Sequence, residues 1–442
     1  MARGEACLPD SSGGYTGTVI ASRRTVLLFT AGTGAEVQAF AEAASRAGAD
    51  VRIVSDRVDA LPAALGDGAI AASFARDPAQ VDRVRRALDG ATIDGVLVIG
   101  PGPAWLAAHV ARDRNLPFHA PEAVALCADR LRMRGRFLAA GLPTPWFVGV
   151  PAGGDDDLGL LARVRFPCLV SASDTAAPGG ALRCDSWDAF LDARRSWAAV
   201  LDGEGADAGS SATRDLIVEG IVPGRGVVVD GVLEAGALRV FALFEELTVT
   251  GPSATTGRLL VSPARMPPEE QHVVAGHVAR AALALGLHHG PVHATCRVDG
   301  QDIVVLSVAP RPPSARLARA LPVVAPDRTR CTFEDALLAH ALGRPLDRYG
   351  HQAIASGMLA LHAAEPGRLV AIEGVDQVGA MSWVTGLEVL AQRGEQLRPG
   401  GGRTSVAVVY AQGAQPDDVI ATLEAAARRL RVVVDGTPTS SS

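Results

Sequence analysis

The stretch from Gly290 to Pro313, GPVHATCRVDGQDIVVLSVAPRPP, limits what this chain can fold into more narrowly than any other. Two apolar runs flank the dipeptide Asp299-Gly300, which is a strong signal for a tight turn between antiparallel strands. A cation, Arg311, follows the second run. The stretch therefore predicts a half-buried β-hairpin whose second strand ends close to an arginine.

The first 120 residues predict a different kind of layer. Short apolar runs at 25–30, 49–56, 95–100 and 116–120 read as strands, and helical spacing lies between them at 35–47, 78–88 and 105–112. Strands that alternate with helices favour a small parallel α/β layer. The AGTG turn at 31–34 lacks the G-x-G-x-x-G spacing, so plain turn glycines are favoured over a dinucleotide loop.

The pattern changes from Pro121 onward. An amphipathic helix is expected over Glu122 to Ala140, ended by Gly141 and the prolines beyond it. A strand in FPCLVSA, the loop SDTAAPGG and a helix over 185–195 follow. The segment 215–247 alternates with turn signals and predicts one antiparallel meander, and further helices are expected at 268–287 and 332–342.

Composition narrows the function classes. A chain of 442 residues that is 48% hydrophobic is expected to form two to three domains. A net charge of −6 without a basic, aromatic-rich face argues against nucleic-acid binding, and no apolar run approaches the roughly 20 residues that span a bilayer. The six scattered cysteines suggest buried, reduced thiols, and we expect a cytoplasmic protein. The sequence has no lysine, so every side-chain cation other than histidine is an arginine.

Taken together, the order of these elements resembles the ATP-grasp superfamily, and within it the carboxylate–amine ligases typified by L-amino-acid ligases. The resemblance rests on DRLRMR with GLPTP, FPCLVS with its glycine loop, LIVEGIVPGRGVVVDG, GPVHAT and VVLSVAPR, and it runs from about Arg24 to the end. It implies a parallel α/β pre-ATP-grasp domain at 24–120 and an ATP-grasp domain at 121–345, whose two α+β subdomains enclose a nucleotide cleft. A flap subdomain at about 145–220, a small C-terminal α+β domain at 346–436 and disordered tails at 1–23 and 437–442 complete the expected organisation.

The resemblance also implies roles for particular residues. Arg130 matches a phosphate-facing lysine of the family, and Glu219 matches an acid that lines the adenine and ribose pocket. His293 and Arg311 match the histidine before the first metal acid and the arginine after the second, which implies a catalytic role for both. Gly179 and Gly180 match the glycines of the phosphate flap.

At three positions that bind phosphate or magnesium in the family, this sequence has a different residue. Ser171 stands where the family has a second phosphate lysine, and Thr295 and Ser307 stand where it has two magnesium carboxylates. Mg²⁺ is normally held by one or two carboxylates plus phosphate oxygens, so two hydroxyls leave ATP phosphate charge uncompensated. Other acids lie in nearby strands or turns and could replace the missing ones, but we expect them to be exposed at the surface. They are Glu245, Glu246, Asp299 and Asp302.

Three functions follow from this pattern. The favoured one is a degenerate ATP-grasp protein with weak or no Mg²⁺-ATP catalysis and an accessory or binding role, whose partner would be an active ATP-grasp paralogue. The second is an active ligase that joins a carboxylate to an amine through an acyl phosphate. The third is a binding protein for a small carboxylate or amino acid, with Arg311 as the anion clamp. The resemblance also implies a homodimer. The histidines of HHGPVH are disfavoured as a transition-metal site, because no full ligand set accompanies them.

Overall fold

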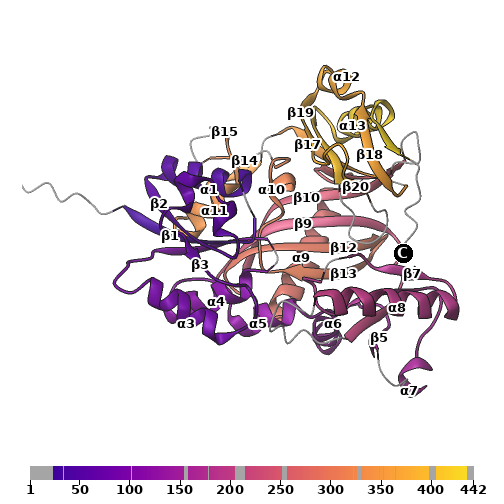
Figure 1. Ribbon diagram of the computed structural model, residues 1–442, viewed down its shortest axis with the longest axis horizontal. Helices are drawn as coiled ribbons and strands as arrows, with labels where there is room; N and C mark the ends of the chain where they lie inside the picture. Colours follow the sequence, from indigo (N-terminus) through magenta and orange to yellow (C-terminus); the bar gives the residue numbers. More distant parts are fainter. Residues whose placement is uncertain are drawn as a thin grey trace, which may run out of the picture.

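The computed structural model describes residues 23–435 except 33, 101, 154–157, 178, 205–214, 251–255, 322, 326–329, 348, 352, 364 and 398–404. The predicted disordered tails at 1–23 and 437–442 lie almost wholly outside the described residues. Figure 1 shows the N-terminal layer at the left, a long curved sheet through the centre and the C-terminal layer above it. No helix in the described ranges has the length and apolar character that crossing a lipid bilayer requires.

The N-terminal layer is a parallel sheet in the order β3-β2-β1-β4. It contains β1 (Arg24–Thr30), β2 (Ala49–Ser55), β3 (Ile70–Ala71) and β4 (Gly95–Ile99), with α1 (Ala35–Ala47), α2 (Ala63–Gly66), α3 (Pro78–Ala87) and α4 (Ala104–Asp113). The parallel α/β prediction is confirmed. The strand predicted at 116–120 is wrong, because this segment forms no strand. Pro117 has no N–H to donate to a ladder, and Leu116 and Phe118 instead pack against the core of the layer.

The helix predicted over 122–140 is two helices. α5 (Pro121–Cys127) ends two residues before Asp129, and α6 (Arg130–Ala139) begins directly after it. Asp129 caps α6, because its side chain accepts a hydrogen bond from the Arg132 backbone N–H at 3.1 Å. Gly141 follows α6 with φ of +67°, a conformation that glycine adopts without strain. The break places Arg130 on the first turn of α6, facing the site described below.

A separate four-stranded antiparallel sheet has the order β5-β8-β6-β7. It comprises β5 (Phe147–Pro151), β6 (Cys168–Ala172), β7 (Leu182–Cys184) and β8 (Asp215–Gly220), with α7 (Leu158–Leu161) and α8 (Trp187–Glu204). The single meander predicted over 215–247 is therefore wrong in its first strand. β8 pairs with β5 and β6, and its apolar face is buried with α8 residues such as Phe190 and Trp197.

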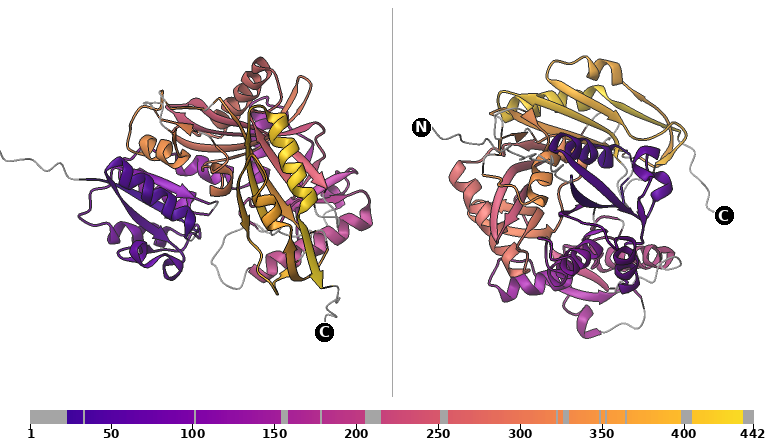
Figure 2. Two further views of the ribbon diagram at one scale, coloured as in Figure 1. Left: turned by 90° about the horizontal axis from the view of Figure 1, so that it is seen from above. Right: turned by 90° about the vertical axis from the view of Figure 1, so that its left-hand side faces the viewer.

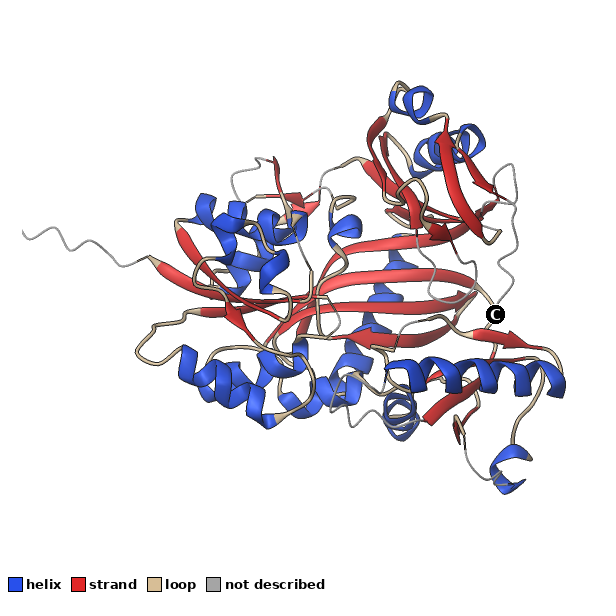
Figure 3. Ribbon diagram, viewed as in Figure 1, coloured by secondary structure: helices blue, strands red, loops and turns tan. Residues whose placement is uncertain are grey.

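The central sheet has eight strands in the order β13-β12-β9-β10-β11-β17-β21-β19. Its first part is β9 (Arg225–Glu234), β10 (Ala237–Thr250), β11 (Thr256–Ser262), β12 (Gly290–Asp299) and β13 (Asp302–Ala309), with α9 (Pro268–Ala284). The hairpin predicted around Asp299-Gly300 is confirmed, because β12 and β13 pair antiparallel across that turn. Figure 3 shows these strands running across the middle of the molecule.

The C-terminal layer continues the central sheet, because β17 pairs with β11 along its full length. Figure 2 shows this layer stacked beside the rest of the molecule, with its long helix on the outside. The elements after β13 are α10 (Ala315–Ala318), β14 (Val323–Val324), β15 (Arg330–Cys331), α11 (Phe333–Ala341), β16 (Gly350–His351), β17 (Ala355–His362), β18 (Gly367–Glu373), α12 (Val375–Gly379), β19 (Val384–Val389), β20 (Gln396–Leu397), β21 (Ser405–Gly413), α13 (Pro416–Arg429) and β22 (Arg431–Asp435).

Candidate functional site

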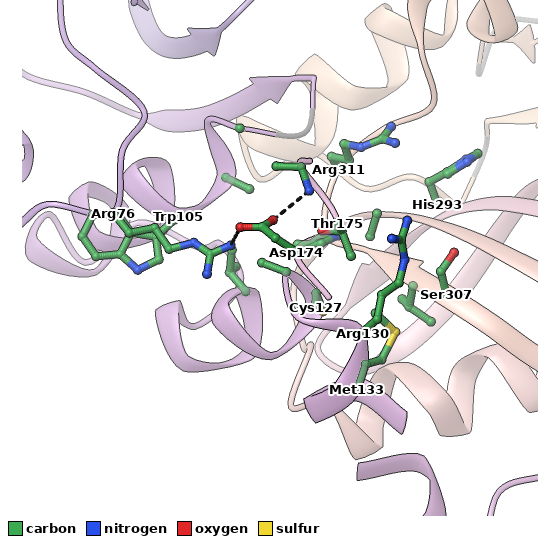
Figure 4. A pocket seen from close by; sticks show the side chains of 18 of the residues that line it. Arg76, Trp105, Cys127, Arg130, Met133, Asp174, Thr175, His293, Ser307 and Arg311 are labelled. Atoms are coloured by element: carbon green, nitrogen blue, oxygen red, sulfur yellow. Dashed lines mark hydrogen bonds and ion pairs between the residues drawn. The ribbon is translucent and has the colours of Figure 1, made fainter. Parts of the chain in front are cut away.

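A pocket of about 370 Å³ lies where the N-terminal layer, α5 and α6, the segment after β6 and the β12–β13 hairpin meet. Its lining includes five residues that the sequence singled out, and Figure 4 shows four of them around the same space: Arg130, His293, Ser307 and Arg311, with Thr295 on the neighbouring strand. The lining also includes Arg76 and Trp105 from the N-terminal layer and Asp174 and Thr175 from the segment after β6. The fold therefore brings together candidates that lie far apart in the chain.

Arg130 lies in the pocket wall and is held by backbone. Its Nη1 donates to the Ala172 carbonyl at 2.8 Å and to Ser171 Oγ at 3.4 Å, so Ser171 supports this guanidinium rather than lining the pocket. Burial lowers the pKa of Arg130, and the negative charge of Glu219 partly offsets that. The cation is partly buried and has no direct ion pair among the described residues, which makes this wall of the pocket electropositive.

The two hydroxyls at the expected metal positions bind each other. Thr295 and Ser307 are register partners on β12 and β13, and Thr295 Oγ1 and Ser307 Oγ are 2.7 Å apart. Each hydroxyl therefore already has a hydrogen-bond partner. A neutral hydroxyl pair is a poor match for Mg²⁺, which prefers carboxylate and phosphate oxygens. No group of three or more His, Cys, Asp or Glu side chains in the described ranges could hold a metal ion. The donor set does not fit Mg²⁺ bound in the manner of the family.

Asp230 is a site residue that the sequence reading missed. It lies opposite His293 in the β9–β12 register, and its Oδ1 is 2.7 Å from His293 Nδ1. Asp230 is fully buried, and its Oδ2 has no hydrogen-bond partner among the described residues. The signal that could have identified it is a single acid inside the otherwise apolar strand VVVDGVL, since carboxylates are almost never fully buried unless they are paired.

Arg311 completes this end of the pocket. Burial lowers the pKa of the Arg311 guanidinium, and the charges of Asp230 and Glu36 partly counter that effect. Its Nη1 donates to the Pro312 carbonyl at 2.9 Å. Within the part of the chain that the structure describes, no carboxylate forms a direct ion pair with Arg311. Arg311 is partly buried, and a guanidinium in such a place that lacks a bidentate partner is suited to bind a carboxylate or phosphate.

Glu219 does not line the pocket. Its Oε2 is 2.9 Å from Arg134 Nε and 2.8 Å from Arg134 Nη2, and Arg134 Nη1 also donates to the Leu306 carbonyl at 2.6 Å. The carboxylate therefore already has an ion-pair partner, and the Arg134 guanidinium links α6 to β8 and β13. A nucleotide-binding role for Glu219 stays a prediction.

The two flap glycines also lie outside the pocket lining. Gly179 and Gly180 are exposed, and Gly179 has φ of +108°. A Cβ at Gly179 would come within 2.9 Å of the Trp197 ring, so this glycine serves close packing as well as an unusual backbone conformation. Contact of either residue with phosphate stays a prediction.

The remaining candidates have other environments. Glu245 is wrongly described as a surface acid, because it is buried and paired with Arg265 at 2.9 Å. Glu246 pairs with Arg258, while Asp299 and Asp302 are exposed at the hairpin turn. None of these four acids lines the pocket. His289 stacks on His340 with ring centroids 4.3 Å apart, and it does not line the pocket, whereas His293 does.

Two family models match parts of this chain. Residues 164–317 match the family model of the ATP-grasp domain, and residues 359–435 match that of the L-amino acid ligase C-terminal domain 2. The chain thus carries an ATP-grasp domain followed by an L-amino acid ligase C-terminal domain, as the sequence predicted. A search of curated protein sequences finds no match.

Solved structures confirm the predicted fold class. An L-amino acid ligase from Bacillus licheniformis matches with a TM-score of 0.73 and 17% identity, over 94% of this chain and 99% of that one. An Aspergillus clavatus carboxyaminoimidazole ribonucleotide synthase complexed with ATP matches with a TM-score of 0.66 and 15% identity, over 91% and 97%. An N5-carboxyaminoimidazole ribonucleotide synthetase from Thermotoga maritima matches with a TM-score of 0.62 and 15% identity, over 93% and 100%. At these identities the likeness establishes the fold.

Proposed function

We propose that this chain is a degenerate ATP-grasp protein of the carboxylate–amine ligase type, with weak or no Mg²⁺-dependent ATP turnover and a binding or accessory role in the cytoplasm. The observation that carries the proposal is the 2.7 Å hydrogen bond between Thr295 and Ser307 at the two expected metal positions. These side chains bring no negative charge, and they form a hydrogen bond with each other.

The charge of the pocket differs from that of a Mg²⁺-ATP site. Mg²⁺ normally neutralises the phosphates while protein carboxylates balance the ion. Arg130 and Arg311 leave the pocket positive without those carboxylates, so an anion is favoured there but a Mg²⁺ ion is not. Removing one electrostatic contact to a transition state typically costs about 3 kcal/mol, and here two acids and the second lysine are absent together.

The ligand that we favour is a small carboxylate or an amino acid. Burial disfavours the charge of Arg311, and an anionic ligand group would compensate that cost through charge-assisted hydrogen bonds. The pocket volume of about 370 Å³ is within the range of small-molecule sites. An accessory role further implies a protein partner, for which we propose an active ATP-grasp paralogue, with a second copy of this chain as the alternative.

An active carboxylate–amine ligase is the second candidate. Asp174 lines the pocket, and Asp230 lies beside His293 with one free carboxylate oxygen. Under this alternative, one of these acids would replace the missing carboxylates. Asp174 is also 3.6 Å from Arg76, and that ion pair would have to open first.

Isothermal calorimetry with ATP, with and without Mg²⁺, separates the two candidates. The proposal expects no Mg²⁺-dependent heat and no ADP release with a panel of amino acids. Mg²⁺-dependent binding at micromolar strength, about 8 kcal/mol, together with ADP release would overturn it in favour of the ligase.

Thermal-shift measurements with the same amino acids test the binding role without ATP. A ligand should raise the melting temperature of the wild type, and Arg311→Gln should abolish that rise. Arg132→Gln is the matched control, because Arg132 is exposed on α6 outside the pocket lining. A rise that survives Arg311→Gln would remove Arg311 as the clamp.

A further inference from the structure

Two buried thiols face each other at the base of the β6–β7 hairpin. Cys168 begins β6, Cys184 ends β7, and the two residues are direct register partners on antiparallel strands. Both are fully buried in the described part of the chain. Directly opposed residues on antiparallel strands have Cα atoms about 4.5 or 5.5 Å apart, and both spacings lie within the range that a disulfide spans.

The thiols also interact with each other. Burial raises the pKa of Cys168 to about 12, and the adjacent Cys184 thiol adds to that rise through its charge and a hydrogen bond. Cys184 Sγ is 3.5 Å from the Ala189 carbonyl, so this side chain is anchored on the first turns of α8. The sequence alone predicts separate buried thiols, because no C-x-x-C spacing marks this pair.

We propose that Cys168 and Cys184 form a reversible intramolecular disulfide that cross-links the two strands of the β6–β7 hairpin under oxidising conditions. With hydrogen peroxide as the oxidant, one thiolate attacks a peroxide oxygen, the O–O bond breaks, and a sulfenic acid and water result. The second thiol then attacks the sulfenic sulfur, the S–S bond forms, and a second water leaves. Two thiols lose two protons and two electrons in total, and one peroxide becomes two waters.

The disulfide would constrain the β6–β7 hairpin, whose loop lines part of the pocket. The hairpin loop is already tied to the α5–α6 junction, because Arg130 N–H donates to the Ser173 carbonyl at 2.8 Å and Thr175 N–H to the Ala128 carbonyl at 3.0 Å. A disulfide at the base would fix the opposite end of the same hairpin. The oxidised chain would then hold Thr175 and its neighbours in place more tightly than the reduced chain.

The burial of both thiols determines the rate of the reaction. Neutral buried thiols are poor nucleophiles, so oxidation must proceed through local opening of the hairpin at its outer strand β7. We therefore expect slow oxidation of the folded protein and faster oxidation when mild urea increases opening. In a reducing compartment the disulfide is expected to be transient and to reverse with a dithiol.

The test uses the reduced full-length protein treated with hydrogen peroxide, alkylated in denaturant and mapped by mass spectrometry under non-reducing conditions. The expected result is a peptide cross-linked between Cys168 and Cys184, a loss of two titratable thiols per chain, and full reversal by dithiothreitol. The melting temperature of the oxidised wild type should rise by more than about 3 °C, because the cross-link closes a loop in the unfolded chain.

Variants separate this pair from the other thiols. Cys184→Ala should lose both the cross-link and the rise in melting temperature, whereas Cys296→Ala should keep both, since Cys296 is equally buried on β12. The proposal is overturned if the wild type keeps all its thiols, if the cross-link joins other cysteines, or if Cys168 and Cys184 are recovered as separate higher oxides. Mapping of the wild type gives this answer even if a variant fails to fold.

Discussion

The ion pair between Arg134 and Glu219 gives the sharpest quantitative prediction. The two side chains are 3% and 13% exposed, and Glu219 Oε2 lies 2.8 Å from Arg134 Nη2. Arg134 also donates to the Leu306 carbonyl at 2.6 Å, so one guanidinium joins α6, β8 and β13. Replacing Glu219 by glutamine keeps the shape of the side chain but leaves a buried cation without its counter-charge.

The expected cost follows from that burial. Breaking a buried ion pair by removing one partner typically costs about 3–5 kcal/mol of unfolding free energy. For a domain of about 150–250 residues, each kcal/mol corresponds to about 2–4 °C in melting temperature, which gives a fall of about 6–20 °C. The double variant Arg134→Met with Glu219→Leu removes both charges together, so it should recover most of the loss.

Thermal and urea unfolding at pH 7 measure these effects. Asp185→Asn is the matched control, because its ion pair with Arg183 is 61% and 64% exposed and should leave the melting temperature unchanged. A Glu219→Gln protein that unfolds within 1 °C of the wild type would contradict the expected cost, and so would a double variant as unstable as the single one. A stable Glu219→Gln protein that loses nucleotide binding would instead support the nucleotide role for Glu219.

Two further predictions concern protons and restored charge. Burial lowers the pKa of His119 to about 4 and that of His340 to about 3, whereas both have a pKa of 6.5 in the unfolded chain. Below pH 6.5 the unfolded chain therefore binds more protons than the folded one, and the free energy of unfolding falls as the pH drops toward 4. Each histidine contributes up to about 1.4 kcal/mol per pH unit, and His119→Phe should flatten the pH profile of urea unfolding. A profile that stays steep in His119→Phe would contradict this. Thr295→Glu with Ser307→Glu should raise Mg²⁺-ATP affinity at least tenfold by calorimetry if the pocket lacks only its acids, and unchanged affinity would mean that the pocket has been repurposed.

The candidate site was only partly predictable. The types of residue at 130, 293, 295, 307 and 311 could be read from the chain, and the structure brings all five into one pocket. Asp230 was missed because its significance depends on its cross-strand neighbour His293, and strand register is a tertiary property. The break at Asp129 was missed because helical spacing continues through it, and only the capping hydrogen bond reveals two helices.

Local sequence patterns were enough to predict most helices and strands, the hairpin around Asp299-Gly300 and the parallel N-terminal layer. The residue identities alone show that positions 295 and 307 carry no acid. These follow from local signals: hydrophobic period, turn residues and residue identity. Tertiary packing alone placed β8 in the sheet with β5 and β6 and paired Glu219 with Arg134. It also placed Cys168 against Cys184. The pairing of β8 and the ion pair of Glu219 join residues far apart in the chain, and the cysteine pair depends on the register of one hairpin. The packing of whole layers selects such contacts rather than any preference of the residues next to them.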